Sequence, residues 1–450
     1  MSTIPSNEPV HQPVTWRRAL AHVLALSLLF LVVYEGTSRI TALRSDVGTW
    51  YYPWERLIPF VPLMIIPYMS IDLFFVAAPF LCRDRRELQL LSGRITLAIL
   101  VAGACFLIYP LRLAVERQTA PGWLGVVWNW FIGMDRPYNL LPSLHIALRT
   151  ILADLYARHT AGLLRLATNV WFSLIGLSTL LTYQHHVVDV IGGFILAAVC
   201  FYLVTDLPLR LPVIRNPRVG WNYVVLGGVL TTLCWATWPW GAILIWPIAS
   251  VAIVAAGYFF LGPSIFRKQY GRLPFSAKLI LAPVLAGQYL SWHYYSRQCR
   301  AWDEVAPSVW IGRWLSDCEA REAVRQGVTA VLDLSDAFSE PKPFRQVAYR
   351  HLPVLDLTAP TPAQLAEAAT FIDAHATQGI VYVHCKIGYS RSAAAVGAWL
   401  LATGRATSVV DAIAQLRTSR PSIVIRQEVR DALCAFAPQP LSAPDPIHAG

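Results

Sequence analysis

The chain has 450 residues, of which 55% are hydrophobic and only 14% are charged, and it contains 17 tryptophans. This length exceeds one typical domain, and the composition excludes a disordered or wholly water-exposed chain and favours a membrane protein. The first 300 residues carry 24 Lys and Arg against 12 Asp and Glu, whereas residues 301–450 carry 13 against 15. We expect no nucleic-acid partner, because no basic stripe with interleaved aromatic residues occurs.

The eight cysteines are scattered and form no Cys-x-x-Cys pair or cluster of ligands. Their spacing predicts neither a zinc site nor a disulfide framework, so we expect no metal and no other cofactor. The polar first 16 residues and the apolar run after them lack a small-residue cleavage site, which predicts an uncleaved first membrane span.

Eight apolar runs follow one another up to residue 262, and most are long enough to cross a bilayer as a helix. We therefore predict an α-helical transmembrane bundle of about eight spans over residues 1–262. Lys and Arg are more frequent in the connections on the side of the N-terminus, which predicts that this side is the cytoplasm. The predicted spans are Ala19–Gly36, Leu57–Cys82, Ile95–Leu113, His145–Ala157, Ala167–Tyr183, Val187–Thr205, Trp221–Trp235 and Gly241–Gly262.

Two polar motifs interrupt this bundle: M-D-R-P-Y-N-L-L-P-S-L-H at Met134–His145 and S-T-L-L-T-Y-Q-H-H-V-V-D at Ser178–Asp189. By the predicted spans, His145 opens the fourth and His185 closes the fifth, so both face the outer side. Two imidazoles there could divide phosphoryl transfer, one attacking phosphorus while the other protonates the departing oxygen.

Three more residues of these motifs could complete such a site. Asp189 lies one helical turn after His185, where a carboxylate can orient the ring and stabilise its charge. Arg136 and the hydroxyl of Ser143 could hold phosphate oxygens. Each residue alone is better explained by a structural role, and only the joint spacing favours a site.

These motifs resemble the type-2 phosphatidic acid phosphatase (PAP2) superfamily, whose pattern is R-P, then P-S-x-H, then S-R-x5-H-x3-D. The resemblance implies that His185 is the nucleophile and His145 the acid. It also implies that Asp189 orients His185, and that Arg136 and Ser143 bind phosphate. The P-S-L-H form looks closest to the branch of inositol phosphorylceramide and sphingomyelin synthases, which leaves a head-group transferase as an alternative.

The sequence departs from the superfamily pattern at two cationic positions. Asn129 stands where a lysine is expected, and Thr179 where an arginine is expected. Arg112, Arg117 or Arg149 could compensate for the missing charge. An inactive half that only anchors the chain therefore remains an alternative.

Residues 263–300 are predicted to form a linker. Its apolar stretch Leu279–Leu290 is only a dozen residues long and contains Pro283, which suits an interfacial or re-entrant helix better than a span. If the stretch lies on the membrane surface, the remainder of the chain is cytoplasmic; if it crosses, the remainder is outside. We predict the cytoplasm.

From residue 301 to about 440, short strand-like and helix-like segments alternate, which predicts an α/β layer fold. Thr361 with Gln364 forms a capping box that starts a helix, and Gly379 ends it. The predicted strands are Ser308–Gly312, Val328–Leu334, Gln346–Leu355 and Ile380–His384, and the other predicted helices are Asp317–Gln326, Ser392–Thr403 and Ser408–Arg417.

The last of these strands leads into I-V-Y-V-H-C-K-I-G-Y-S-R-S-A at Ile380–Ala393. Cys385 stands between a strand end and a helix start, where converging amides and the helix N-terminus favour negative charge and lower the thiol pKa. Arg391 supplies a planar fork that matches two phosphate oxygens. Gly388 permits the tight turn between them.

This run resembles the H-C-x5-R-S/T loop of cysteine-dependent phosphatases, most closely the dual-specificity branch. The resemblance implies that Cys385 is the nucleophile and that Arg391 binds the phosphate. His384 would orient the loop, and Ser392 would assist breakdown of the cysteinyl-phosphate. The loop residues that would contact the phosphate are Lys386, Ile387, Gly388, Tyr389 and Ser390.

The reaction also needs an acid that protonates the leaving oxygen. Asp356 follows a predicted strand and precedes Cys385 at a distance similar to that in dual-specificity phosphatases. Asp333 and Asp336 are weaker candidates for this role.

The substrate class is open between two readings. Lys386 adds a charge suited to a polyanionic head group, and H-C-K-x-G-x-S-R-S looks similar to the mitochondrial phosphatase of phosphatidylglycerophosphate, with a departure at Tyr389. We predict hydrolysis of phosphomonoesters on phospholipid head groups, such as phosphatidylglycerophosphate or phosphoinositides. The alternative is a membrane-tethered protein-tyrosine or dual-specificity phosphatase acting on phosphoproteins.

The chain as a whole resembles a bacterial fusion of a PAP2-like membrane domain with a dual-specificity phosphatase domain. We therefore expect an integral protein of the bacterial inner membrane. Its predicted parts are the bundle at 1–262, the linker at 263–300 and a phosphatase domain at 301–440, the last in the cytoplasm.

Overall fold

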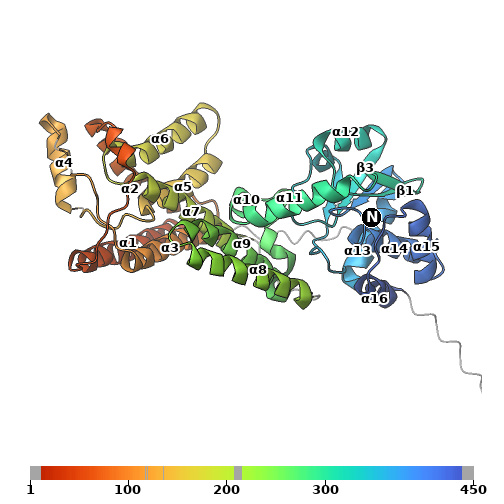
Figure 1. The fold of residues 1–450 in the computed structure, drawn as a ribbon. Coiled ribbons are helices and arrows are strands. Elements are labelled where there is room, and N and C mark those ends of the chain that lie inside the picture. The colour runs from red at the N-terminus through yellow and green to blue at the C-terminus, as the bar shows by residue number, and fades with distance from the viewer. Residues whose placement is uncertain (1–11, 117, 119, 135, 207–214, 438–450) are drawn as a thin grey trace, which may run out of the picture. The chain divides into compact units, whose positions relative to one another are not determined.

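A computed structural model describes residues 12–116, 118, 120–134, 136–206 and 215–437 (Figure 1). The chain forms two compact units, Met1–Asp206 and Leu207–Gly450. The first unit is helical. The second contains further apolar helices followed by an α/β fold, which confirms the predicted fold class.

The first unit is built around α3, which packs against α1, α5 and α7. Small residues permit close approach, and a Cβ at Gly103 would lie 2.4 Å from the Val33 side chain of α1. Asp84 starts α3 by accepting a hydrogen bond from the Glu87 amide. The helices are α1 (Trp16–Ala42), α2 (Ile65–Leu81), α3 (Arg85–Ile108), α4 (Gly122–Met134), α5 (Leu144–His159), α6 (Gly162–Leu181) and α7 (Val187–Leu203), with short 3-10 helices η1 (Pro53–Leu57) and η2 (Pro62–Met64).

Six helical segments in the described part of the chain are long and apolar enough to cross a membrane: α1, Pro62–Leu81, α3, α6, Pro217–Ala236 and Trp240–Phe266. The predicted spans at α5 and α7 have only 16 and 17 helical residues, and α5 carries Arg149 and Asp154. The predicted number of eight spans is therefore not confirmed and stays a prediction.

The second unit begins with α8 (Pro217–Ala236), which packs side by side with α9 (Ile245–Ala256). The linker, for which one short interfacial or re-entrant helix was predicted, forms two helices, α10 (Phe275–Ile280) and α11 (Ala282–Ser296), and α11 packs on α9. The connecting turns are η3 (Trp240–Leu244), η4 (Gly257–Leu261) and η5 (Gly262–Phe266).

The sheet has the strand order β1-β2-β5-β3-β4, in which only the β1–β2 pair is antiparallel. The predicted strand Gln346–Leu355 is wrong in length, because Pro353 offers no amide and the pairing stops before it. The strand β1 and the helix α16 were not predicted. The elements are β1 (Trp302–Ala306), β2 (Val309–Gly312), α12 (Asp317–Arg325), β3 (Val328–Asp333), η6 (Pro343–Gln346), β4 (Ala348–His351), α13 (Pro362–Ala376), β5 (Ile380–His384), α14 (Arg391–Ala402), α15 (Val409–Ser419) and α16 (Gln427–Phe436).

Helices cover both faces of this sheet (Figure 1). Val381 and Val383 of the central strand β5 pack toward α13, α14 and α16, whereas Tyr382 packs toward α12 and η6. β5 is buried on both faces, and the loop after it leads directly into the buried helix α14. Buried elements therefore fix both ends of this loop.

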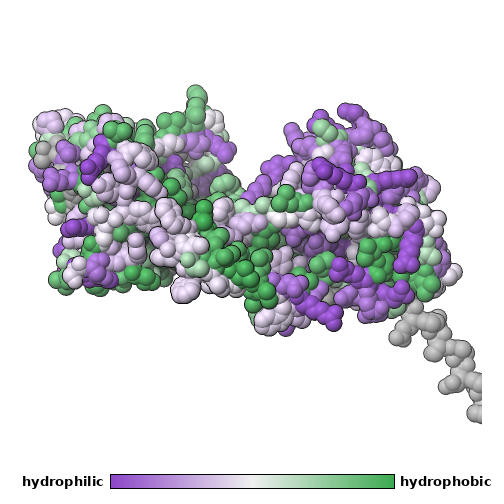
Figure 2. All heavy atoms as spheres, viewed as in Figure 1, coloured by the Kyte–Doolittle hydropathy of each residue, from purple (hydrophilic) through white to green (hydrophobic). Residues whose placement is uncertain are grey.

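The surface character of the second unit changes along the chain. Figure 2 shows hydrophobic residues over the visible surface of α8 and α9, and many hydrophilic residues over the α/β fold. On α8, Trp221, Val225 and Trp235 are all more than half exposed. Exposed apolar residues on a helix of this length suit contact with lipid.

Candidate active sites

The loop after β5 wraps around the thiol of Cys385. The Gly388 amide donates to the sulfur over 3.3 Å, and the Ser392 hydroxyl lies 3.5 Å from it. Gly388 has φ of +78°, and a Cβ there would lie 2.4 Å from the Gly312 carbonyl oxygen, so only glycine fits. The α14 helix begins at Arg391, directly behind the loop.

The surroundings of Cys385 favour the thiolate. Burial alone would raise the thiol pKa, but the Arg391 guanidinium, the Ser392 hydroxyl and the Gly388 amide outweigh it and lower the pKa to about 7. A large fraction of Cys385 is therefore a nucleophilic thiolate at neutral pH.

Arg391 is buried and fixed by three acceptors. It donates to the carbonyl oxygens of Leu334 (3.2 Å) and Val354 (2.8 Å), and to the Asp356 carboxylate over 2.9 Å. Although burial raises the pKa of Asp356, Arg391 and Lys386 outweigh that effect and hold it below its usual range. Asp356, which the sequence predicted as the acid, thus lies at the pocket.

His384 sits in a buried ionic cluster behind the loop. Its Nε2 is 3.2 Å from Glu340 and 3.8 Å from Asp333, and Lys268 bonds to Asp333 over 2.5 Å. Burial lowers the pKa of His384, but Glu340 and Asp333 outweigh it and raise the pKa to about 9, so the ring is cationic at neutral pH. Asp333, a weaker candidate for the acid, is occupied in this cluster.

The carboxylates of Asp333 and Glu340 with His384 have the spacing of a metal site. The Lys268 ammonium, 2.5 Å from Asp333 and 3.5 Å from Glu340, supplies the compensating cation there. The donor set therefore fits a buried salt-bridge network. The sequence missed Lys268 and Glu340, since neither belongs to a local motif.

Arg420, which the sequence did not predict either, anchors the phosphate loop through its backbone carbonyls. Its fully buried guanidinium donates to the carbonyl oxygens of Ile387 (3.1 Å) and Gly388 (3.0 Å), and it pairs with Asp303 at 2.6 Å. Holding these carbonyls outward leaves the loop amides facing inward. A phosphate would meet those amides.

Lys386 points into the same pocket. Its ammonium donates to Gln288 (2.6 Å) and Ser291 (2.9 Å) of α11 and lies 3.6 Å from Asp356. Ile387, Tyr389 and Ser390 also line the pocket. All the residues that the sequence predicted for this site therefore lie around one cavity or directly behind it.

A second cavity, of about 360 Å³, lies within the first unit. His145, His185 and Arg136 all line it, as the sequence predicted for a common site. The His145 ring stacks on Tyr68 with centroids 4.2 Å apart. The Nδ1 atom of His185 is 3.6 Å from the Asp189 carboxylate, an arrangement that can orient the imidazole.

Other features of this region fit phosphate less well, and neither Ser143 nor Thr179 is among the described residues that line the cavity. The Ser143 hydroxyl is buried and caps α5 through the Ile146 amide, and Thr179 bonds to its own helix. Glu35 and Asp72 line the cavity, and Arg136 is 3.9 Å from Glu35.

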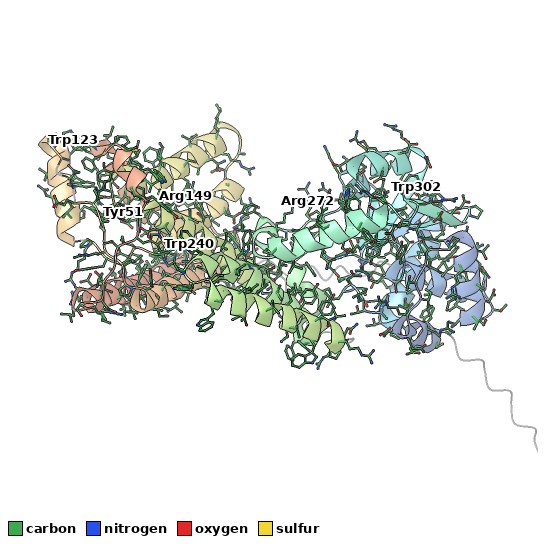
Figure 3. The ribbon with its side chains drawn as sticks, in the orientation of Figure 1. Tyr51, Trp123, Arg149, Trp240, Arg272 and Trp302 are labelled. Atoms are coloured by element: carbon green, nitrogen blue, oxygen red, sulfur yellow. The ribbon has the colours of Figure 1, made fainter. Side chains whose placement is uncertain are left out.

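The candidate replacement cations do not complete the set. Arg149, labelled in Figure 3, lies in the first unit. Its Nε donates to the Phe172 carbonyl over 2.6 Å. Arg112 does not line the cavity, and Arg117 lies outside the described residues. Within the part of the chain that the structure describes, neither Arg112 nor Arg149 therefore replaces the positive charge missing at Asn129 and Thr179.

Comparison with known proteins finds one family in the α/β part of the second unit and another in the first unit. Residues 310–439 match the family "Dual specificity phosphatase, catalytic domain", and residues 68–203 match the "PAP2 superfamily". Dual specificity protein phosphatase 26 of Bos taurus is 32% identical over 142 residues, which cover 30% of this chain and 67% of that protein.

Two further similarities are more limited. Dual specificity protein phosphatase CDC14AB of Danio rerio is 29% identical over 22% of this chain, and the match spans only 16% of that protein. The crystal structure of PTPMT1 in complex with PI(5)P is 25% identical, with a TM-score of 0.29, over 30% of this chain and 94% of that one. Through its C-terminal fold the chain belongs to the dual-specificity phosphatase family, and its first unit carries a domain of the PAP2 superfamily.

Proposed function

We propose that this phosphatase hydrolyses the terminal phosphomonoester of a phospholipid head group, such as that of phosphatidylglycerophosphate or a phosphoinositide. The Cys385 thiolate attacks phosphorus while Asp356, in the molecules in which it has bound a proton against the effect of Arg391 and Lys386, gives that proton to the departing alcohol, which leaves a cysteinyl-phosphate. Asp356 then takes a proton from water, whose oxygen attacks phosphorus and releases phosphate and the thiolate. Arg391 and the loop amides stabilise the charge on the transferred group.

The observation that carries the lipid substrate is the direct hydrogen bonding of the acid loop, at Asp356 and Leu357, to apolar helices. Asn216, which caps α8, donates to the Leu357 carbonyl over 2.7 Å, and Tyr258 donates to the Asp356 carbonyl over 2.9 Å. The acid loop is thus fixed at the start of one candidate span and near the end of the next. A merely tethered enzyme would not need these contacts.

Lys386 supports the same proposal. Its ammonium is held at the pocket by Gln288 and Ser291, close to Asp356. A second cation beside Arg391 suits a head group that carries an anionic phosphodiester as well as the phosphomonoester.

The test is phosphate release by the full chain from phosphatidylglycerophosphate and phosphatidylinositol-phosphate vesicles, and from phosphotyrosine peptides. We expect at least one lipid to be turned over with a kcat/KM tenfold or more above any peptide. Cys385→Ser, made in a His185→Ala background that removes the proposed second site, should abolish this activity. A preference for peptides would overturn the lipid proposal.

That preference would support the second candidate, a membrane-tethered protein phosphatase. The relatives named dual specificity protein phosphatases favour it. In that case the head-group contacts of Lys386 would not matter, and Lys386→Gln would change lipid and peptide hydrolysis equally.

For the first unit we propose a second, histidine-dependent lipid-phosphate site. His185 is the nucleophile, His145 the acid and Asp189 the orienting carboxylate, with Arg136 and Ser143 as phosphate ligands. Shared lining of one cavity by both histidines supports this assignment. Labelled phosphate appearing on an acceptor lipid would indicate a transferase, and unchanged lipid turnover after His185→Ala in a Cys385→Ser background would indicate an inactive anchor.

We infer an integral protein of the bacterial inner membrane with the phosphatase domain at 301–440 on the cytoplasmic side, after a bundle at 1–262 and a linker at 263–300. Contact of α11 with Lys386 supports a linker that does not cross the membrane. A C-terminal reporter active only in the cytoplasm tests this, and a reporter active outside would reverse the orientation.

A further inference from the structure

The cavity at Cys385 is much larger than a phosphate group. Its volume is about 740 Å³, within the range of sites that enclose drug-sized ligands. It extends from the phosphate loop along helices α8, α9 and α11. Its far part is lined by the apolar residues Leu226, Leu230, Pro247, Val251, Pro283 and Val284.

Helix α8 gives the cavity a direction. Tyr223, Leu226 and Leu230 are three and four residues apart, so their side chains lie on one face of the helix. From Tyr223 to Leu230 the helix rises about 10 Å. Because Asn216 at the start of α8 is bonded to the acid loop, the apolar face leads away from Asp356 along a candidate membrane span.

The polarity of the lining changes in one order along this direction. Cys385 and Arg391 form the charged end, and Gln288 and Ser291 with Lys386 form a polar middle. The apolar side chains of α8, α9 and α11 form the other end. A phospholipid with a phosphorylated head group has the same order: a terminal phosphate, a polar head group and then acyl chains.

We propose that α8, α9 and α11 form the acyl-chain binding groove of the Cys385 site. The terminal phosphate lies in the loop, the head group lies beside Lys386, and an acyl chain lies against Leu226, Leu230 and Val251. This assignment rests on the proposed lipid phosphatase function. It makes the helices part of the substrate site in addition to anchoring the chain.

The test fills the groove in the full chain. Leu230→Trp and Val251→Trp, made separately and assayed in detergent micelles, should lower kcat/KM for long-chain phosphatidylglycerophosphate at least tenfold relative to kcat/KM for p-nitrophenyl phosphate. The matched control is Val225→Trp, whose site is on another face of α8 and is 64% exposed. This control should leave the ratio within twofold.

A second measurement does not depend on turnover. In the Cys385→Ser chain, a lipid with a photoreactive group at the end of its acyl chain should crosslink to peptides of α8, α9 or α11. The absence of such crosslinks would overturn the groove. So would an unchanged ratio of kcat/KM for the lipid to kcat/KM for p-nitrophenyl phosphate in both tryptophan variants, whether or not the two values fall together.

The assays also separate failure of the groove from failure of the proposed function. If the wild-type chain hydrolyses no lipid, both proposals fail. If it hydrolyses lipids normally while the ratio is insensitive to Leu230→Trp and Val251→Trp, only the groove is wrong. If Leu230→Trp and Val251→Trp lowered kcat/KM tenfold for phosphopeptides alone, the groove would bind a peptide, and the proposal of an acyl-chain groove would be overturned.

Discussion

At Cys385, burial and charge act on the thiol in opposite directions. Burial favours the neutral thiol, whereas the Arg391 guanidinium, the Ser392 hydroxyl and the Gly388 amide favour the anion and bring the pKa to about 7. An unperturbed cysteine has a pKa of about 8.5, so the site holds far more thiolate at neutral pH than an ordinary cysteine would.

This balance predicts the pH dependence of alkylation. The rate of iodoacetamide reaction at Cys385 should rise with pH to a midpoint near 7, because the fraction of thiolate rises through the pKa. Arg391→Ala removes the main stabilising charge, so its midpoint should shift upward by at least one unit. Mass spectrometry of the Cys385 peptide across pH measures both, and a midpoint that does not respond to the loss of Arg391 would contradict this electrostatic account.

The residues of a local motif could be predicted from the sequence, and their remote partners could not. Cys385, Arg391 and Ser392 lie within eight residues, and Asp356 was found from its distance to Cys385. Lys268 and Glu340 act on His384 from far along the chain. Nothing in their neighbouring residues indicates that contact, because a single buried lysine or glutamate has no characteristic sequence pattern.

At the scale of elements, the phosphate loop is a strand, a turn and a helix whose ends are fixed separately. The buried strand β5 and the buried helix α14 were predicted almost to the residue, since apolar β-branched residues precede the loop and an alanine-rich run follows it. The strand β4 was predicted too long because Pro353 stops the pairing, and β1 was missed. Loop orientation depends on Arg420 of the α15–α16 connection, which only the folded chain brings to Ile387 and Gly388.

We expect Arg420→Gln to act on the loop as a whole. The carbonyls of Ile387 and Gly388 lose their hydrogen-bond donor, so the loop amides are no longer held toward the phosphate. We expect a loss of about 1.5–3 kcal/mol in transition-state stabilisation, which lowers kcat/KM roughly 10- to 150-fold for every phosphoester. The alkylation midpoint of Cys385 should rise as well, which a purely remote loss of stability would not cause.

The matched control is the exposed Arg417→Gln on α15, which should change neither measurement. If Arg420→Gln lowered the melting temperature but left kcat/KM and the alkylation midpoint unchanged, Arg420 would be only a structural residue.

At the scale of the whole molecule, the second unit joins apolar helices and the α/β fold into one compact body. The predicted domain start at 301 separates Lys268 from the buried carboxylates of Asp333 and Glu340. An uncompensated buried charge is strongly destabilising, by about 3–5 kcal/mol when one partner of a buried pair is removed. We therefore predict that the phosphatase fold depends on residues before 301.

Chain truncation tests this directly. A fragment of residues 301–450 should unfold at a lower denaturant concentration than a fragment of residues 263–450, because only the longer one retains Lys268. In the longer fragment, Lys268→Met should reproduce most of the difference, whereas Lys278→Met on α10 should not. Equal midpoints for the two fragments would show that the buried cluster does not depend on Lys268.

The central claim is that Cys385 takes the phosphate directly from a membrane lipid. The measurement is rapid acid quenching of the full chain during turnover of phosphatidylglycerophosphate labelled in its terminal phosphate, followed by mass spectrometry of the modified peptide. We predict phosphate on the Cys385 peptide of the wild-type chain, accumulating further in Ser392→Ala, which lacks the hydroxyl beside the sulfur that would assist breakdown of the cysteinyl-phosphate. Lipid turnover with no label at Cys385 in either protein would contradict the account.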